Sequence, residues 1–279
     1  MVSMNKLSSA KRTQVVAALV EGNSIRATVR MTGVAKNTVV KLLVELGAAC
    51  DKYQRETLVG LRSRRIECDE IWSFVYAKEG NADPAMKAAG TAGDVWTWTA
   101  LDPDSKLMVS WLVGHRDAGY AQAFMEDVAY RLANRVQITT DGNRLYLQAV
   151  ETAFGMDVDY AQLVKLYGSP EDGERTYSPA VCIGCRKTAI MGDPAPEHIS
   201  TSKVERANLT MRMSMRRFTR LTNAFSKKIE NHEAAVALHF MYYNFGRVHQ
   251  TLRVTPAMEA GLSDHVWTLA EIVALLDRA

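Results

Sequence analysis

Three acidic residues that lie far apart in the chain have the chemistry of a divalent metal site. Asp69 stands in the segment RRIECDEIWSFV, Asp141 in VQITTDGNRLY and Glu205 in STSKVERANLTMRMSMRR. Carboxylate oxygens are the ligands that hard cations such as Mg²⁺ prefer, and two such ions can stabilise both the attacking and the leaving oxygen of a phosphodiester. The three residues therefore predict phosphoryl-transfer chemistry on a DNA or RNA strand.

Each of these acids also has a structural interpretation. Asp69, in an aromatic-rich strand, is costly to bury unless it is paired or binds a metal, and Glu67 on the same strand face is an alternative ligand. The period of two places Glu70 on the opposite face. Asp141 directly precedes a helix and would serve equally well as its N-terminal cap. Glu205 would otherwise be a surface residue paired with a neighbouring cation, which contributes little to stability.

The predicted helix around Glu205 has two distinct faces. Its apolar residues recur at helical spacing and are expected to be buried: Val204, Ala207, Met211, Met215 and Phe218. Beside them, Glu205 and Arg212 share a stripe and lie two turns apart. A carboxylate for a metal and a cation for the adjacent phosphate would then stand on one face, so Arg212 joins the candidate catalytic residues.

Basic charge is concentrated in two segments of a chain whose formal net charge is only +3. Residues 1–65 carry twelve Lys and Arg against four Asp and Glu, and residues 203–228 carry eight against one. Such concentration is typical of phosphate binding, although solvated helix faces have the same composition. The predicted DNA contacts in the second segment are Arg206, Arg216, Arg217 and Arg220.

The first 50 residues predict three short helices, of which the second and third are joined by a turn that contains Gly33. This is the helix-turn-helix pattern, in which the start of the last helix enters the major groove of DNA. A plain three-helix bundle is the alternative. The residue types at the exposed positions favour DNA binding, and the predicted contacts are Arg26, Lys36, Asn37, Thr38 and Lys41.

Residues 51–64 are interpreted as a polar and basic linker, with a continuation of the preceding helix as the alternative, and the hydrophobic period changes from helical to two at Arg65. The following segments predict three antiparallel strands, a helix, a short strand that Asp141 follows, a second helix and a last strand. This order is typical of an α/β protein with an RNase H-like mixed sheet. The predicted catalytic core spans residues 65–250, and a helical tail covers residues 251–279.

Residues 166–202 predict an irregular insertion within the core, because they contain four prolines among Gly and Ser residues. Within it, Cys182 and Cys185 have the spacing of half a zinc site, with His198 as a third candidate ligand. Ordinary thiols in a loop are the simpler interpretation. Four cysteines in 279 residues are too few for a disulfide scaffold, so we expect a reducing compartment.

Four segments together resemble the DDE transposases of bacterial insertion sequences, and most closely the insertion-sequence-one family. They are CDEIWSFV, TTDGNRLY, VERANLTMRMSMRRFTRLTNAFSK and YNFGRVHQTLRVTPAMEAGL, which together cover most of residues 65–262. The resemblance implies an RNase H-like core with an Asp-Asp-Glu triad that binds two Mg²⁺ or Mn²⁺ ions. Asp69, Asp141 and Glu205 match that triad, and Arg212 matches a basic residue seven positions after the glutamate. The paired cysteines of a zinc ribbon, which often precede the helix-turn-helix in this family, are missing here.

The resemblance implies an insertion-sequence transposase that binds terminal inverted repeats and catalyses metal-dependent DNA nicking and strand transfer. Its partners would be double-stranded DNA, both repeats and target, and at least one further copy of the chain, since two ends must be joined. Two alternatives stay open: a helix-turn-helix regulator with an inactive core, and an RNase H-like nuclease or resolvase without strand transfer. No run of about 20 apolar residues and no signal-peptide core is present, so we expect a soluble, nucleoid-associated protein in a prokaryotic cytoplasm.

Overall fold

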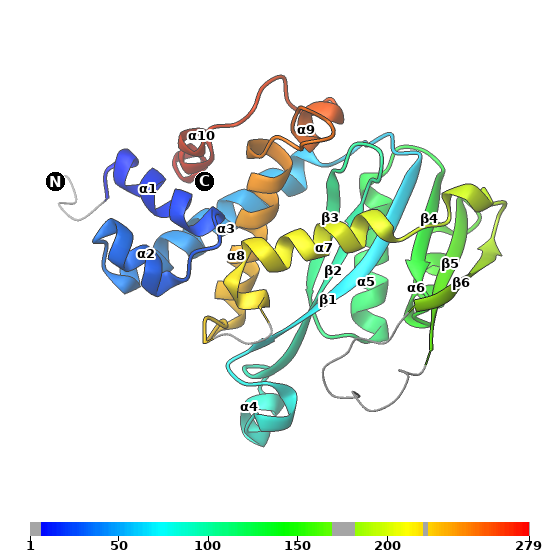
Figure 1. The fold of residues 1–279 in the computed structure, drawn as a ribbon, viewed down its shortest axis with the longest axis horizontal. Helices are drawn as coiled ribbons and strands as arrows, with labels where there is room; N and C mark the ends of the chain where they lie inside the picture. Colours follow the sequence, from blue (N-terminus) through cyan, green and yellow to red (C-terminus); the bar gives the residue numbers. More distant parts are fainter. Residues whose placement is uncertain (1–6, 169–181, 220–222, 279) are drawn as a thin grey trace.

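The computed structural model describes residues 7–168, 182–219 and 223–278. They form a mixed sheet with helices on both faces, and helices from both ends of the chain pack together beside it (Figure 1). The strands are β1 (Arg65–Val75), β2 (Gly93–Leu101), β3 (Met108–Gly114), β4 (Val136–Asp141), β5 (Val158–Tyr167) and β6 (Cys182–Met191). The α-helices are α1 (Ser9–Val20), α2 (Ile25–Thr32), α3 (Lys36–Thr57), α4 (Pro84–Ala88), α5 (Ala118–Arg131), α6 (Leu145–Phe154), α7 (Ser202–Ser214), α8 (Ile229–Met241), α9 (Pro256–Glu259) and α10 (Leu269–Ala274). None of the described helices is both long and apolar enough to cross a membrane.

The sheet has the strand order β3-β2-β1-β4-β5-β6. The first three strands of the chain form an antiparallel meander, β4 pairs parallel with β1, and β5 pairs parallel with β4. The edge strand β6 returns antiparallel to β5. The α/β class is confirmed, and this arrangement is consistent with the RNase H-like core that the order of elements predicts.

Side chains of β2 show which helices cover which face of the sheet. The ring of Trp98 packs against Phe124 of α5 and Tyr146 of α6, with centroids 5.9 and 5.5 Å apart. The next residue, Thr99, points the other way, and its hydroxyl donates to Oδ1 of Asn208 on α7 at 3.2 Å. Helices α5 and α6 therefore cover one face, and α7 crosses the other (Figure 1).

Helix α7 buries the face that its apolar spacing predicts. All five residues of the predicted stripe, including two just beyond the end of the helix, are buried: Val204, Ala207, Met211, Met215 and Phe218. This stripe fixes the rotation of α7 about its own axis. The positions beside it, among them Glu205, therefore lie at the border between the sheet and solvent, where a polar site can form.

The helix that begins after the turn at Gly33 is longer than the sequence predicts. Gly33 ends α2 in the left-handed region, at φ +70°, and α3 then runs for 22 residues. Much of the predicted linker at 51–64 thus belongs to α3, and the predicted domain boundary at residue 50 falls inside a helix. Helix α3 crosses α8 closely at Gly47, where a Cβ atom would stand 2.5 Å from Ala234.

One cluster of buried apolar side chains joins the N-terminal helices to the sheet. It extends from Val15 in α1 to Leu275 near the C-terminus. Helix α10, in the predicted tail, packs against α1, so the tail covers the N-terminal helices. The N-terminal helices therefore share their core with the rest of the chain.

The predicted irregular insertion at 166–202 is wrong in part. Strand β5 continues to Tyr167, and residues 182–191 form β6, which pairs with β5 along most of its length. Cys182 and Cys185 consequently lie in a strand and not in a loop. The side chains of β6 are exposed along nearly its whole length, so its sequence carries no alternation of apolar and polar residues that would reveal a strand.

Candidate active site

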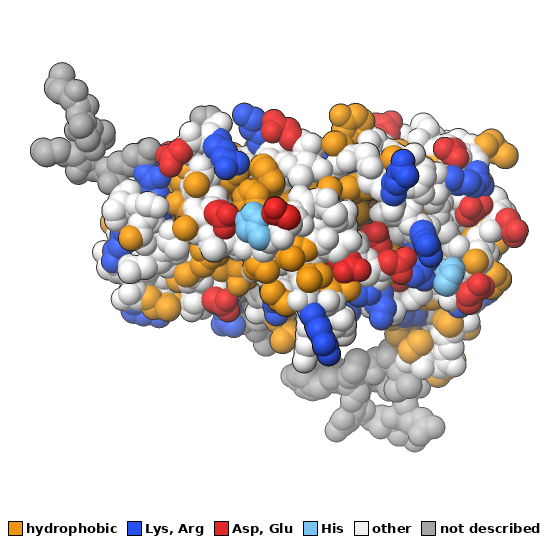
Figure 2. All heavy atoms as spheres, turned by 90° about the horizontal axis from the view of Figure 1, so that it is seen from above, with side chains coloured by type: hydrophobic (Ala, Val, Ile, Leu, Met, Phe, Trp, Pro, Cys, Tyr) orange, Lys and Arg blue, Asp and Glu red, His pale blue; other side chains and the backbone are white. Residues whose placement is uncertain are grey.

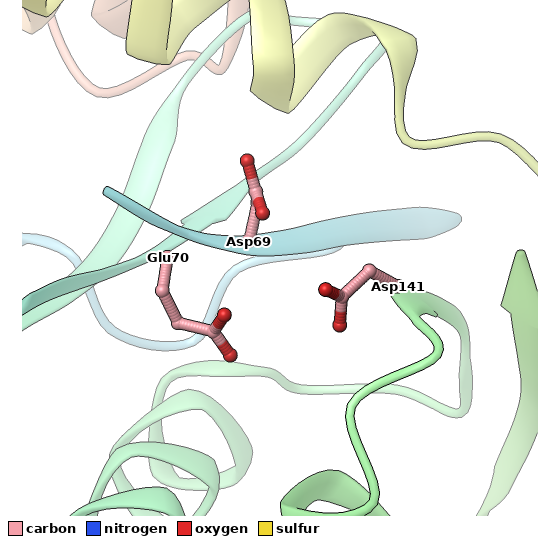
Figure 3. A group of neighbouring side chains, drawn as sticks. All are labelled: Asp69, Glu70 and Asp141. Atoms are coloured by element: carbon pink, nitrogen blue, oxygen red, sulfur yellow. The ribbon is translucent and has the colours of Figure 1, made fainter. Parts of the chain in front are cut away.

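The parallel pairing of β1 with β4 brings Asp69 and Asp141 together. Glu67 is aligned with Thr139 in that register, so the residues two positions further along each strand, Asp69 and Asp141, stand side by side. Among the described residues, Asp69, Glu70 and Asp141 form a group in which one carboxylate oxygen from each lies within 4.8 Å of the others (Figure 3). We refer to these three residues as the acidic cluster.

Glu70 belongs to this cluster although it points away from Asp69. In Figure 3, Asp69 projects from β1 toward α7 and Glu70 projects to the opposite side, as the strand period requires. Asp141 lies at the very end of β4, where its carboxylate reaches between the two faces. Glu70 is held by the amide of Asn143, which donates to Oε1 at 3.0 Å, and by the guanidinium of Arg116, 3.4 Å from Oε2.

The cluster concentrates negative charge in a place that water reaches poorly. Burial raises the pKa of Asp69 to about 7, and the nearby charges of Glu70 and Asp141 contribute, against a hydrogen bond from Asn208. Burial and the charge of Asp141 also raise the pKa of Glu70. These carboxylates repel one another when ionised, and a bound cation would relieve that repulsion.

The donor set suits a hard divalent cation. All three groups offer carboxylate oxygens, and a Mg²⁺ ion with ligands at about 2.1 Å binds oxygens that are at most about 4.2 Å apart. Oxygens that lie within 4.8 Å of one another need to approach by less than about 1 Å to meet this limit, which side-chain rotation allows. The residues present therefore fit such an ion.

Helix α7 places Asn208 and Glu205 beside the cluster. Nδ2 of Asn208 donates to Oδ2 of Asp69 at 2.9 Å. Glu205 lies one turn earlier on the same side of α7 and accepts a hydrogen bond from the hydroxyl of Thr201 at 2.6 Å. Its other carboxylate oxygen forms an ion pair with Lys165 of β5. Glu205 is thus adjacent to the acidic cluster but outside it, and its part in the predicted triad stays a prediction.

The ammonium group of Lys165 pairs with Glu205 and also interacts with the charge of Asp69. Burial lowers the pKa of Lys165, but the hydrogen bond and charge of Glu205, together with the charge of Asp69, outweigh that effect and raise the pKa overall. Lys165 therefore neutralises Glu205 in this state. Both side chains keep about a third of their surface exposed, so the pair can separate at low cost.

Glu67, the alternative ligand, has a structural role in this arrangement. Its Oε2 atom accepts hydrogen bonds from the backbone N–H groups of Lys203 and Val204, at 2.7 and 3.0 Å. These are unpaired donors of the first turn of α7, so Glu67 caps the helix from β1. Burial raises the pKa of Glu67 despite these two hydrogen bonds. The carboxylate positions α7, and with it Glu205 and Asn208, against the strand.

The remaining basic candidates differ in their exposure. Arg206 and Arg216 are exposed, and Arg212 is partly buried. Arg217 points inward, because its Nη1 atom donates to Oγ of Ser226 and to the carbonyl of Asn231, both at 2.7 Å. This engagement gives Arg217 a structural contact that its place in a basic run does not reveal. Arg220 lies outside the described residues.

The candidate DNA contacts of the N-terminal helices lie on the surface. Thr38 is partly buried, and the exposed ones are Arg26, Lys36, Asn37 and Lys41. Lys41 forms an ion pair with Glu45 one turn later, at 3.7 Å. On the face of the molecule that Figure 2 shows, basic and acidic side chains are interspersed. Contact between the N-terminal helices and DNA stays a prediction.

Cys182 and Cys185 line a pocket with Glu205 and belong to no metal group among the described residues. Cys185 is aligned with Lys165 across the β5–β6 pair, and both residues line a pocket of about 430 Å³ that also includes Glu205. In the described part of the chain, no group of three metal-binding side chains includes either cysteine. His198, the third candidate for zinc, instead has its Nδ1 atom 2.9 Å from the guanidinium of Arg65.

Comparisons with known proteins identify no family. No family model matches the chain, and no curated protein matches it. The chain is similar to a solved structure described as a Mos1 transposase paired-end complex with left transposon end, at 14% sequence identity and a TM-score of 0.22. The match covers 55% of this chain and 59% of that chain, so this chain spans less than two thirds of it. So low a structural overlap supports no conclusion about fold or function.

Proposed function

We propose that the protein is a DDE-type transposase of the insertion-sequence kind, which nicks DNA and transfers the freed strand with the aid of divalent metal ions. One observation carries the proposal: the parallel pairing of β1 with β4 brings carboxylate oxygens of Asp69 and Asp141 within 4.8 Å of each other, next to the helix that bears Glu205. Burial raises the pKa of Asp69 and so disfavours its charged form, which makes its place beside Asp141 support for a role in binding cations.

Metal binding would fall to the carboxylates of Asp69, Asp141 and Glu205, with Glu70 close enough to contribute. When bound, two Mg²⁺ or Mn²⁺ ions would polarise the scissile phosphodiester and lower the pKa of the attacking hydroxyl. The contacts of this chain supply the positioning. Asn208 donates a hydrogen bond to one oxygen of Asp69. Lys165 holds Glu205 beside the cluster through an ion pair, which would have to open when Glu205 binds a metal ion.

The proposed reaction consists of two in-line displacements at phosphorus. In the first, a water oxygen bonds to phosphorus while the bond to the 3′ oxygen breaks, which leaves a 3′-hydroxyl on the element. In the second, that hydroxyl attacks a phosphodiester of the target DNA, and the target's own 3′ oxygen departs. Arg212, two turns after Glu205 on α7, would bind the adjacent phosphate, so that catalysis rests on positioning and charge stabilisation.

Recognition of the terminal inverted repeats would fall to α2 and α3. The exposure of the candidate side chains supports this role, since the start of α3 carries Lys36, Asn37 and Lys41 on its solvent side. Arg206 and Arg216, on or just after α7, would contact DNA nearer the acidic cluster. Joining two ends calls for at least two copies of the chain on DNA.

A plasmid assay tests the proposal. The full-length chain, Mg²⁺ and a supercoiled plasmid that carries the DNA flanking its gene should give nicked circles. The same chain should join a pre-cleaved repeat end to a second plasmid. Both products should disappear with Asp141→Asn, while Glu151→Gln, which changes an exposed carboxylate on α6, should leave them intact.

The outcomes separate the rival functions. Nicking without joining would indicate a nuclease or resolvase, whereas specific DNA binding without either product would indicate a regulator. Replacing Lys36 or Arg26 should weaken binding to the repeats. It should also make the salt dependence of binding shallower, because a protein with one phosphate contact fewer releases fewer counterions from the DNA when it binds. An unchanged affinity and salt slope would remove α2 and α3 from the DNA interface.

A further inference from the structure

Beyond Glu70, the same face of the sheet carries a line of aromatic side chains. Trp72 and Phe74 follow Glu70 along β1 at the strand period of two, and Trp96 of β2 is aligned directly with Trp72. Both tryptophans are partly exposed. Tyr76, just after the strand, extends the line and is 46% exposed. We refer to Trp96, Trp72, Phe74 and Tyr76 as the aromatic strip.

Each end of the aromatic strip carries basic side chains over its rings. The guanidinium carbon of Arg116 lies 4.9 Å from the ring centroid of Trp96, and Nζ of Lys78 lies 5.8 Å from that of Trp72. Nζ of Lys227 lies 5.6 Å from the ring of Tyr76. All cation–ring contacts found in the described residues involve this strip or Phe225, which packs on it.

The backbone at Tyr76 is strained. Its φ of +63° lies in the left-handed region, which a bulky residue occupies only at a cost on the order of 1 kcal/mol or more. A hydrogen bond from the N–H of Tyr76 to the carbonyl of Ser226, at 2.8 Å, holds this conformation. Strain that keeps an aromatic ring in solvent is typical of a binding surface.

The aromatic strip is continuous with the acidic cluster. Arg116 touches both, since one nitrogen of its guanidinium is 3.4 Å from Glu70 while its plane stands over Trp96. Tyr76 comes six positions after Glu70, so the strip reaches roughly 20 Å from Glu70 at the rise of a strand. On the Glu70 side of β1, the line of rings therefore begins directly beside the acidic cluster.

We propose that the aromatic strip binds unpaired nucleotides of the DNA strand whose phosphodiester lies at the acidic cluster. The bases stack on the exposed surfaces of Trp96, Trp72 and Tyr76, whereas Phe74 is buried, and Arg116, Lys78 and Lys227 contact the phosphates. This pairing of aromatic rings with basic side chains is the chemistry by which proteins hold single strands regardless of sequence. The inference rests on the proposed function, since it requires DNA as the substrate.

The test measures binding of a fluorescent twelve-nucleotide oligo-dT by anisotropy, in EDTA so that no cleavage takes place. Trp72→Ala and Trp96→Ala should each weaken binding by about tenfold, because each removes a stacking partner. Tyr130→Ala, which removes a 75% exposed ring from α5, is the matched control and should bind as the parent does. Binding to repeat-containing duplex DNA should change by less than about twofold in all three.

Milder variants guard against loss of folding. Trp72→Phe keeps a ring and should retain most of the affinity. Lys78→Gln and Lys227→Gln should each reduce the salt slope of oligo-dT binding by about 0.7, as expected for one lost phosphate contact on a single strand. The inference is overturned if the parent protein does not bind oligo-dT, or if the tryptophan variants bind it like the Tyr130→Ala control. Because the assay needs neither metal nor nicking, a failure of the proposed catalysis would be seen separately.

Discussion

Strand β1 contributes to two polar sites that differ in the partners of their ionisable groups: neutral hydrogen-bond partners at one, and other carboxylates at the other. At its middle, Asp69 and Glu70 meet Asp141. Four residues after Asp69, the hydroxyl of Ser73 lies 3.2 Å from Nε2 of His232. His232 and Arg217 both contact Ser226, and we refer to Ser73, Arg217, Ser226 and His232 as the buried basic network.

The buried basic network is closed by neutral partners. Both ring nitrogens of His232 face hydroxyl groups, and Arg217 donates to a hydroxyl and a carbonyl. Burial, with the charge of Arg217, lowers the pKa of His232 to about 3, so the ring is uncharged at neutral pH. In the acidic cluster, three carboxylates instead lie close together, and the pKa values of Asp69 and Glu70 are raised. The contrast indicates that the buried basic network stabilises the fold, whereas the acidic cluster destabilises it, as functional sites often do.

The largest expected effect is on catalysis at the acidic cluster. Asp69→Asn, Asp141→Asn or Glu205→Gln should lower the rate of plasmid nicking by roughly a thousandfold or more, because each removes several kcal/mol of metal-dependent charge stabilisation. In metal-free buffer, the two aspartate variants should unfold at the same or a higher urea concentration than the parent. Full nicking activity in any variant would exclude that residue from the site.

In the buried basic network, a substitution is expected to lower the stability of the fold, unlike the aspartate substitutions in the acidic cluster. Arg217→Met should lower the free energy of unfolding by about 2–3 kcal/mol, since it removes two inward hydrogen bonds of the guanidinium, to Oγ of Ser226 and to the carbonyl of Asn231. The adjacent and exposed Arg216→Met is the control and should change stability by less than about 0.5 kcal/mol. Urea unfolding measures both. Equal stability of the two variants would mean that the inward contacts of Arg217 contribute nothing.

Acid should weaken the fold through its buried histidines. His232 and His239 both have a pKa of about 3 in the folded chain, lowered by burial, against an ordinary value of 6.5. Above pH 6.5 they are neutral in both states and have no effect. As the pH falls below 6.5, these histidines become protonated in the unfolded chain but stay neutral in the folded chain. The free energy of unfolding therefore drops by up to about 1.4 kcal/mol per pH unit for each histidine.

Urea unfolding between pH 7 and pH 4.5 measures this loss. His239→Gln should remove about half of the histidine-dependent slope whatever its effect on stability at pH 7. If the substitution leaves the slope unchanged, His239 has the same pKa in the folded and unfolded chain, and the prediction drawn from its burial is wrong.

The smallest expected effect concerns Lys165, whose ammonium group pairs with Glu205 next to the acidic cluster. Lys165→Gln frees Glu205 from a half-exposed ion pair, and such pairs contribute about 0.2–1 kcal/mol. The Mg²⁺ concentration that half-saturates nicking should therefore fall by about two- to fivefold. Lys187→Gln, on the neighbouring strand β6, is the control. A lower nicking rate at an unchanged half-saturating concentration would instead indicate that Lys165 contacts DNA.

The sequence was most informative where a residue's neighbours along the chain decide its environment. The helical spacing of α7 predicts all of its buried apolar residues, though not the buried Asn208, and the change of period at Arg65 predicts the start of β1. Strand β6 escaped prediction because hydrogen bonds to β5 make it a strand while its side chains remain exposed. Glu70 was placed on the opposite face of β1, correctly, but the reach of Asp141 around the strand end could not be foreseen.

The sequence alone determined the kinds of ligand and the local elements that carry them: carboxylates on a strand, at a strand end and on a helix, since spacing and side-chain chemistry are local properties. The tertiary structure decided which of them meet. The register of β1 with β4 unites Asp69 and Asp141 across more than 70 residues, and Glu67 binds the start of α7 instead of a metal. Pairing register and helix docking depend on contacts between distant segments, whose energies no single stretch of sequence contains.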